Sequence, residues 1–247
     1  MGQITIQDYT TKDPITMLGK EAGICWGGNT QDEEKNYKRG LDCILSGHWR
    51  TMEFPQVYLI FDGYSARLAR EIYTHIAGGP TRLQTSTRYV DYESNFKYYV
   101  PSSIRGNADA LKVYNNLMAK IQADAKRLEM FGIPREDIAN ILPLGMETCV
   151  VMRTNLRHLV DMSHQRLCNR AYHEFRRWMR DLMEVLRNYS DEWKQCVNNL
   201  FMPKCEVCGY CTEAKSCGRM PKKKTVWEKG DVHEDFGCEG MLPGGGE

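Results

Sequence analysis

The sequence lacks the features of a membrane protein or a secreted protein. No apolar run in its 247 residues reaches the ~18 residues that a membrane-spanning helix needs. Residues 1–6 contain neither the basic stretch nor the apolar stretch of a secretory signal. The sequence therefore predicts a cytoplasmic protein with no membrane partner.

The sequence also lacks an excess of charge of either sign. Its 33 Lys and Arg residues nearly balance 32 Asp and Glu residues, and the net charge is +1. A protein that binds nucleic acid generally presents a strongly positive surface, and here the only short basic run is 222–224. The composition, 42% hydrophobic and 26% charged, is that of an ordinary globular protein, and nucleic acid is not the expected partner.

Cysteine is plentiful, with ten residues, and without a secretory signal these are expected to be reduced thiols. Four of them lie close together in the sequence: Cys205, Cys208, Cys211 and Cys217. Two-residue gaps let two thiolates reach one ion, so the cluster is a candidate structural zinc site. Zinc sites usually pair two short segments across a longer gap, so free cysteines in a packed loop are the alternative. With the basic run 222–224, the cluster also raises a second class of function, a zinc-dependent nucleic-acid-binding module.

Hydrophobic periodicity predicts a mixture of helices and strands. Helices are predicted over 14–25, 32–45, 66–76, 107–130 and 165–186, with a shorter one that begins at Thr154 or Asn155 and ends near Met162. Strands rich in β-branched and aromatic residues are predicted over 56–61, 96–100 and 147–153, with a possible short strand at 4–6. The chain is expected to form a main domain over 1–190 and a C-terminal extension over 191–247, of which 219–247 reads as a tail.

The segment 73–89 is the most unusual stretch in the sequence. It breaks at Gly78-Gly79-Pro80 and then crowds hydroxyls, an amide and arginines together. A glycine-rich break lets the backbone approach a ligand. If the following residues are extended, Gln84, Ser86 and Arg88 point to one face and would suit a phosphate and a polar ring. A polar surface loop is the alternative.

A second feature is a row of basic residues at helical spacing in the predicted helix 165–186. Arg166, Arg170, His173 and Arg177 would share one face of that helix. Such a stripe is usually solvated surface, but it could equally line a site for an anionic ligand.

These segments follow one another in an order that resembles the flavin-dependent thymidylate synthases, over roughly residues 14–185. The matching segments are 47–52, 84–89, Asn155 to Arg157, and Arg166 eleven residues after Asn155. The chain departs from the family pattern at one place. Thr74-His75-Ile76 stands where the family has Arg-His-Arg, Gln84 stands at the family's Glu, and two extra residues lie between them. Arg82 and Arg70 are the candidates to supply the missing positive charge.

The resemblance implies an α+β fold, with a mixed or antiparallel sheet flanked by long helices. It also implies reductive methylation of dUMP at C5, with methylenetetrahydrofolate as carbon donor, FAD as hydride carrier and NADPH as reductant. A homotetramer with shared active sites is expected. Because the signature is altered, a related methylase acting on UMP or another uridine nucleotide is the alternative.

The resemblance also assigns roles to single residues. Arg166 would stabilise the negative charge that builds on the uracil ring, since arginine stays protonated. The residues expected to contact dUMP are Glu71, Thr74, Arg82, Gln84, Ser86, Thr87 and Arg88. Those expected to contact FAD are Thr51, Thr74, His75, Ile76, Gln84, Asn155 and Arg157. Simpler roles exist for some: His75 could cap a helix end, Asn155 could be only an N-cap, Glu71 could be a surface carboxylate, and His48, a weaker flavin candidate, could be a buried histidine.

Overall fold

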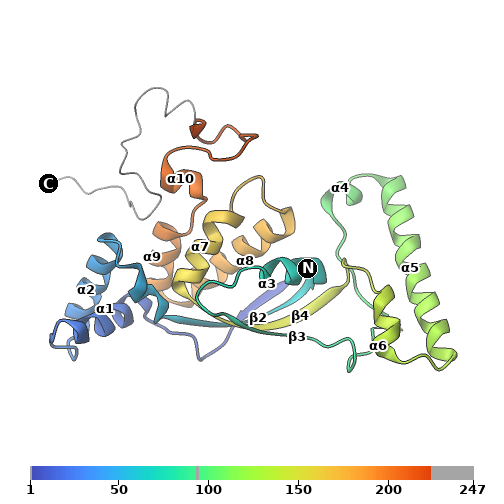
Figure 1. The fold of residues 1–247 in the computed structure, drawn as a ribbon, viewed down its shortest axis with the longest axis horizontal. Coiled ribbons are helices and arrows are strands. Elements are labelled where there is room, and N and C mark those ends of the chain that lie inside the picture. Colours follow the sequence, from blue (N-terminus) through green and yellow to red (C-terminus); the bar gives the residue numbers. More distant parts are fainter. Residues whose placement is uncertain (1, 93–94, 224–247) are drawn as a thin grey trace. The chain divides into compact units, whose positions relative to one another are not determined.

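The computed structural model describes residues 2–92 and 95–223 (Figure 1). Its strands Gln3–Ile6 (β1), Gln56–Ser65 (β2), Thr81–Gln84 (β3) and Glu147–Asn155 (β4) form one four-stranded sheet in the order β1-β2-β4-β3. Helices make up most of the remaining regular structure, so the predicted α+β class is confirmed. The chain divides into two compact units. The first comprises 2–5, 60–75, 82–92 and 95–152, and the second comprises 6–59, 76–81 and 153–223.

The first unit contains one long helix and several short ones. They are Ala66–Tyr73 (α3), Ser102–Arg105 (α4), Ala108–Met130 (α5), Arg135–Ile138 (α6) and the 3₁₀ helix Ala139–Ile141 (η2). Side chains cap two of these helices: the Ser65 hydroxyl accepts from the Leu68 N–H at 3.1 Å, and Asn107 Oδ1 accepts from the Ala110 N–H at 3.0 Å. A small core forms around Phe96, Met118 and Met146.

Three expectations for this unit were wrong. The segment 96–100 is not a strand. Among the described residues it makes a single antiparallel bridge, from Tyr98 to Met146. The segment is followed by Pro101, which has no N–H to continue a ladder of hydrogen bonds. The helix predicted to reach Ile76 ends at Tyr73. The strand predicted over 56–61 continues to Ser65 as β2, with Gly63 at φ +70°.

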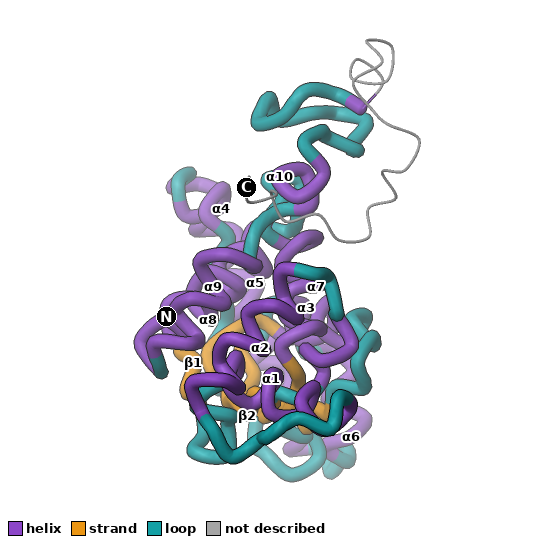
Figure 2. Tube along the Cα trace, turned by 90° about the vertical axis from the view of Figure 1, so that its left-hand side faces the viewer, coloured by secondary structure: helices purple, strands orange, loops and turns teal. Residues whose placement is uncertain are grey.

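The second unit is mainly helical. Its helices are Pro14–Cys25 (α1), Glu33–Leu45 (α2), Trp49–Glu53 (η1, a 3₁₀ helix), Leu156–Arg166 (α7), His173–Tyr189 (α8), Asp191–Leu200 (α9) and Lys204–Cys208 (α10). Asp32 caps α2, because its carboxylate accepts from the Lys35 N–H at 3.1 Å. Figure 2 shows α1 and α2 as two neighbouring helices.

Helices α1 and α2 approach each other through glycine. A Cβ added to Gly19 would lie 1.8 Å from the backbone oxygen of Asn36, and one added to Gly40 would lie 2.0 Å from that of Ile15. No side chain fits at such distances, so the two backbones touch directly at these positions. The helix pair carries the loop and 3₁₀ helix that follow it, which contain Thr51.

The helix predicted over 165–186 is in fact two helices. Helix α7 ends at Arg166 and α8 begins at His173, and Arg170 lies in the connection. Arg176 Nη1 donates to the carbonyl of Asn169, which holds the turn together. The prediction of a basic stripe along one helix is therefore wrong. The apolar residues keep the same helical spacing across the break between the two helices, so the sequence alone suggests a single helix.

The chain continues to pack beyond residue 190. Helix α9 buries Trp193, Cys196 and Val197, and Glu192 accepts hydrogen bonds from the N–H groups of Ile15 and Thr16 at 2.7 and 2.9 Å. The Glu192 carboxylate thereby provides hydrogen-bond acceptors for N–H groups in the first turn of α1, which have no acceptor within the helix itself. The part of the predicted tail after residue 223, including Lys224, lies outside the described residues.

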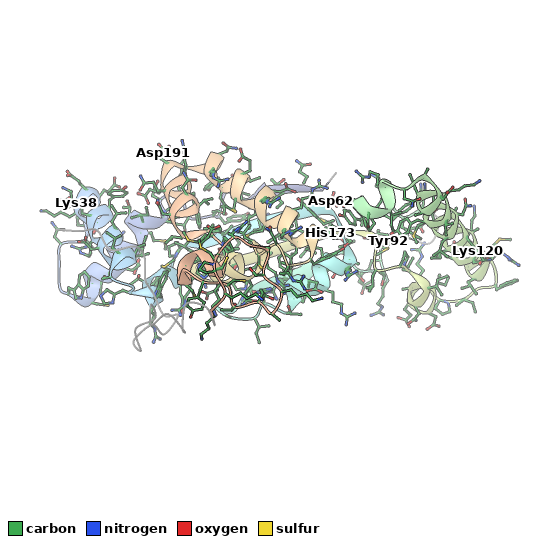
Figure 3. The ribbon with its side chains drawn as sticks, turned by 90° about the horizontal axis from the view of Figure 1, so that it is seen from above. Lys38, Asp62, Tyr92, Lys120, His173 and Asp191 are labelled. Atoms are coloured by element: carbon green, nitrogen blue, oxygen red, sulfur yellow. The ribbon has the colours of Figure 1, made fainter. Side chains whose placement is uncertain are left out.

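Charged side chains point outward from both units, as Figure 3 shows for Lys38 on α2 and Lys120 on α5. Each forms an exposed ion pair within its own helix, Lys38 with Glu34 at 2.6 Å and Lys120 with Asp124 at 3.1 Å. Across 2–92 and 95–223, no helix combines the length and the apolar character needed to cross a bilayer.

Candidate functional site

The N-terminus of α7 lies against the glycine break of the unusual segment. Asn155 Oδ1 caps the helix by accepting from the His158 N–H at 2.9 Å, and Asn155 Nδ2 donates to the carbonyl of Gly78 at 3.1 Å. Gly78 has φ +74°, and a Cβ there would lie 2.9 Å from Asn155 Nδ2. The glycine is thus needed both for its conformation and for the close approach. Arg153 Nη2 adds a bond to the carbonyl of Gly79 at 3.3 Å.

This double role of Asn155 gives a stability prediction. Asn155→Ala removes the cap and the bond to Gly78, and should lower the free energy of unfolding by about 1–3 kcal/mol. Asn107→Ala is the matched control, because Asn107 caps α5 in the same way, and among the described residues its side chain has no second bond like the one from Asn155 to Gly78. It should cost about 1 kcal/mol. Urea unfolding of both variants measures the difference; equal losses would mean that the bond to Gly78 contributes nothing.

A cavity of about 480 Å³ brings together residues about 100 positions apart in the sequence. Thr51 and Arg157, both expected to contact flavin, line it with His48, Trp49 and other residues of the second unit. The Thr51 hydroxyl donates to the carbonyl of His48 at 2.6 Å. The wall of this cavity therefore combines indole rings with a hydroxyl and a guanidinium.

Arg157 is held in position by two carboxylates. Its nitrogens lie 3.7 Å from Glu53 and 3.9 Å from Asp161. Burial raises the pKa of Asp161, while the neighbouring Arg157 opposes that rise by favouring the ionised form. Both ion pairs are long and partly exposed, so the guanidinium can exchange them for an anionic ligand.

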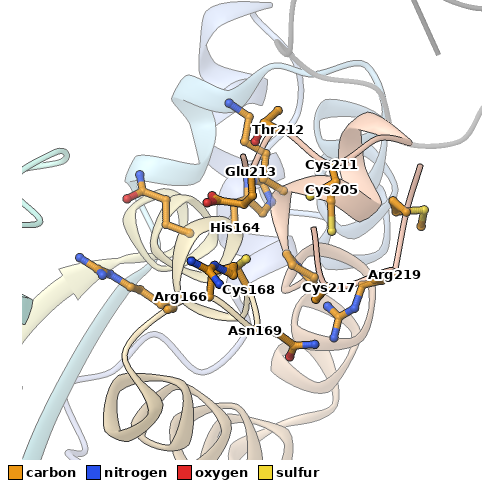
Figure 4. Close-up of a pocket in the computed structure, with 16 residues that line it drawn as sticks. His164, Arg166, Cys168, Asn169, Cys205, Cys211, Thr212, Glu213, Cys217 and Arg219 are labelled. Atoms are coloured by element: carbon orange, nitrogen blue, oxygen red, sulfur yellow. The ribbon is translucent and has the colours of Figure 1, made fainter. Parts of the chain in front are cut away.

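A second pocket, of about 320 Å³, surrounds the end of α7 (Figure 4). Arg166 lines it, and its guanidinium carbon lies 4.6 Å from the centre of the Phe175 ring. His164 lines it too, and burial lowers the pKa of this histidine, although Asp161 partly offsets the shift. The other lining residues come from the α7–α8 connection and from the chain after α9. Among them the sequence analysis missed Lys204 and Arg219, because only the fold brings them to Arg166.

The polar residues that follow β3 are arranged differently from the prediction. The strand ends at Gln84, and 86–89 form a turn in which the N–H of Tyr89 bonds to the carbonyl of Ser86 at 3.3 Å. Gln84, Ser86 and Arg88 therefore do not alternate along one extended face. Gln84 Nε2 donates to the Thr148 hydroxyl at 3.2 Å, and Arg88 pairs with Glu136 at 3.0 Å. Thr87 lies within the same turn.

Arg82 occupies the end of α3. Its guanidinium carbon lies 5.3 Å from the centre of the Tyr73 ring, and Nη2 donates to the carbonyl of His75. Burial lowers the pKa of Arg82, and its Nε has no hydrogen-bond partner among the described residues. The Thr74 hydroxyl donates to the carbonyl of Glu71 at 2.7 Å. Ile76, which belongs to the second unit, is 76% exposed. The positively charged Arg82 guanidinium thus lies next to His75, the middle residue of the altered triplet.

The cysteine cluster is not arranged as a metal site. Nowhere in the described part of the chain are three or more His, Cys, Asp or Glu side chains grouped to hold an ion, and the described cysteines form no disulfide with one another. Cys205, Cys211 and Cys217 instead line the pocket around Arg166 together with Cys168, whereas Cys208 does not. The arrangement does not support the zinc site that the spacing predicted.

The sequence is similar to known proteins over most of its length. Residues 6–190 match the family model described as thymidylate synthase complementing protein. The chain is 26% identical over 246 residues to a flavin-dependent thymidylate synthase of Pyrococcus furiosus, covering 93% of this chain and 98% of that one. A second such enzyme, from Thermococcus kodakarensis, is 30% identical over 228 residues, covering 86% and 90%.

A solved structure has the same fold. Thymidylate synthase X of Helicobacter pylori, crystallised with FAD and dUMP, aligns with a TM-score of 0.57 at 16% identity. The alignment covers 80% of this chain and 99% of that one.

Proposed function

Because the chain belongs to the thymidylate synthase complementing protein family, we propose that it is a flavin-dependent thymidylate synthase. It transfers a one-carbon unit from methylenetetrahydrofolate to C5 of dUMP, and NADPH is the reductant. The observation that carries the proposal is the cavity that brings Thr51 to Arg157 near the capped start of α7. These residues are far apart in the sequence, and the family resemblance assigns both of them to the flavin.

The residues around this cavity fit FAD. The first turn of α7 presents N–H groups that suit an anionic diphosphate, and Arg157 adds a positive charge in the same turn. The glycine break at Gly78 and Gly79 has no side chains to obstruct the approach of a ligand. Bound FAD would carry hydride to the one-carbon unit, while Thr51, Asn155 and Arg157 bind and orient it.

The nucleotide is bound by cations and polar groups. Arg166 holds a permanent positive charge for the uracil ring, whose C5 becomes nucleophilic as negative charge builds on the ring. Gln84, Ser86, Thr87 and Arg88 supply the remaining nucleotide contacts, and Arg88 can exchange its exposed pair with Glu136 for a phosphate. Arg82, placed beside Thr74 to Ile76, replaces the charge of the arginines that the triplet lacks.

That altered triplet supports a second candidate substrate, because it stands where the family signature meets the ligands. A homologue that accepts UMP would use the same chemistry at the same ring carbon. Cysteines that form no disulfide with one another among the described residues suit a reducing compartment, and we propose that the enzyme acts in the cytoplasm.

A direct assay tests the function. The purified chain should bind FAD, seen by its visible absorbance, and convert dUMP to dTMP only when methylenetetrahydrofolate and NADPH are both present. The assay is run under low oxygen, because reduced flavin reacts with it, and with UMP in parallel. Activity on UMP alone would reassign the substrate. A colourless protein that takes up no FAD would reject the enzyme.

We also propose a homotetramer, supported by an exposed apolar face of α5. Val113 and Leu117 on α5, and Phe131 directly after it on the same side, are 68%, 50% and 74% exposed. A second copy of the chain would cover such a face. Leu117→Asp should reduce the mass measured by analytical ultracentrifugation, whereas Ala119→Asp, on the opposite side of α5, should not. An unchanged mass for both would place the interface elsewhere.

A further inference from the structure

The pocket at the end of α7 gathers positive charge from separate segments of the chain. Arg166 and Arg170 come from α7 and its connection to α8, Lys204 begins α10, and Arg219 follows the cysteine cluster (Figure 4). Glu213 is the only carboxylate among the lining residues of this described pocket. Gathering like charges is unfavourable unless something of opposite charge compensates them.

The carboxylates of the described residues compensate this charge only in part. Arg219 pairs with Glu206 at 3.1 Å, and Arg166 lies over the Phe175 ring. Among the described residues, neither Arg170 nor Lys204 has a carboxylate within ion-pair distance. Two cations that face a pocket of about 320 Å³ without a partner are suited to an anionic ligand.

We propose that this pocket binds the glutamyl carboxylates at the tail of the folate substrate, an inference that rests on the proposed function. Arg166 lines the pocket, and in the proposed function it acts on the uracil ring, where the one-carbon unit has to arrive. The carbon-donating end of the folate must then reach the neighbourhood of Arg166, and its tail must extend away from there. Arg170 and Lys204 line the same pocket as Arg166 and would meet that tail.

The distribution of the cations favours several carboxylates over one phosphate. A single phosphate is bound most strongly by cations that converge on one point. Here the cations come from three segments spread around the pocket, which matches the repeated, separate carboxylates of a polyglutamyl chain. The dUMP phosphate already has Arg88 and Ser86 as partners in the proposed site.

Binding can be measured on the full chain with FAD bound, without relying on turnover. Pentaglutamyl tetrahydrofolate should bind more tightly than the monoglutamyl form, and less so as salt is added. The double variant Arg170→Gln, Lys204→Gln should weaken pentaglutamyl binding roughly fivefold to thirtyfold, as expected for two partly exposed ion pairs. Monoglutamyl binding should stay unchanged. Arg180→Gln with Lys215→Gln, two exposed cations outside the pocket, is the matched control.

A second readout locates the ligand. Cys217 lines the pocket, is exposed, and hydrogen-bonds with the Asn169 side chain. Pentaglutamyl tetrahydrofolate should slow alkylation of Cys217, followed by mass spectrometry, and should leave the exposed Cys25 of α1 unprotected. The same alkylation is repeated with dUMP and with NADPH.

Three results would overturn the inference. The first is equal affinity of the wild-type protein for the two folates, and the second is an unchanged affinity of the double variant. The third is protection of Cys217 by dUMP or NADPH but not by the pentaglutamyl folate, which would assign the pocket to a phosphate. A protein that binds monoglutamyl folate but shows any of these results keeps its proposed function. One that binds neither folate loses both.

Discussion

Arg166→Ala is expected to slow methyl transfer to dUMP by about a hundredfold to a thousandfold, the usual loss when one group that stabilises developing charge is removed. FAD should remain bound, because Arg166 lines a different pocket from Thr51 and Arg157. Single-turnover oxidation of reduced flavin, with the flavin absorbance of the purified variant, measures the two quantities separately.

Arg177→Ala is the control for this variant. Arg177 is a partly exposed arginine on α8 that pairs with Asp181 at 3.5 Å and does not line the pocket. Its loss should leave the rate within about twofold, since such a pair contributes under 1 kcal/mol. Full activity of Arg166→Ala would reject the assignment. Loss of flavin together with activity would indicate that Arg166 supports the fold instead of the reaction.

Gly19→Ala should be the most destabilising conservative substitution in the second unit. The added Cβ would lie 1.8 Å from the backbone oxygen of Asn36, so α1 and α2 must separate. Overpacking of this kind costs about 3 kcal/mol or more when backbone has to move. Thermal unfolding should show a lower midpoint. Flavin affinity should also fall, because both helices contribute to the cavity that Thr51 and Arg157 line.

Gly23→Ala, one turn further along α1, is the matched control. Its Cβ would meet the end of the Arg39 side chain at 2.2 Å, and a long side chain can move aside. The change should cost little, because alanine favours a helix over glycine by about 1 kcal/mol. Similar losses in both variants would mean that the contact between α1 and α2 is not rigid.

The sequence predicted features that depend on neighbouring residues. Helix α5 and its Asn107 cap were predicted correctly, because the apolar period and the capping side chain lie within the helix itself. The order of the motifs, with Asn155, Arg157 and Arg166 at fixed spacing, was enough to indicate the family. It also indicated that Thr51 and Arg157 would meet one ligand.

Features that depend on residues far apart in the sequence were missed. Nothing in 165–186 signals that a helix ends at Arg166 and a new one begins at His173, since the apolar period continues across the break. Gln84, Ser86 and Arg88 were predicted to share one face, which requires an extended backbone. The backbone forms a turn there instead.

By itself, then, the sequence determined the family and the α+β class, and it indicated which residues to expect in the chemistry, because these follow from residue types and short spacings. Only the tertiary structure decided which side chains meet. It placed Lys204 and Arg219 in the pocket that Arg166 lines, brought Cys205, Cys211 and Cys217 to the same pocket, and used Gly19 and Gly40 as points of backbone contact. The physical reason is that contacts between distant segments depend on the packing of whole helices, which no local pattern encodes.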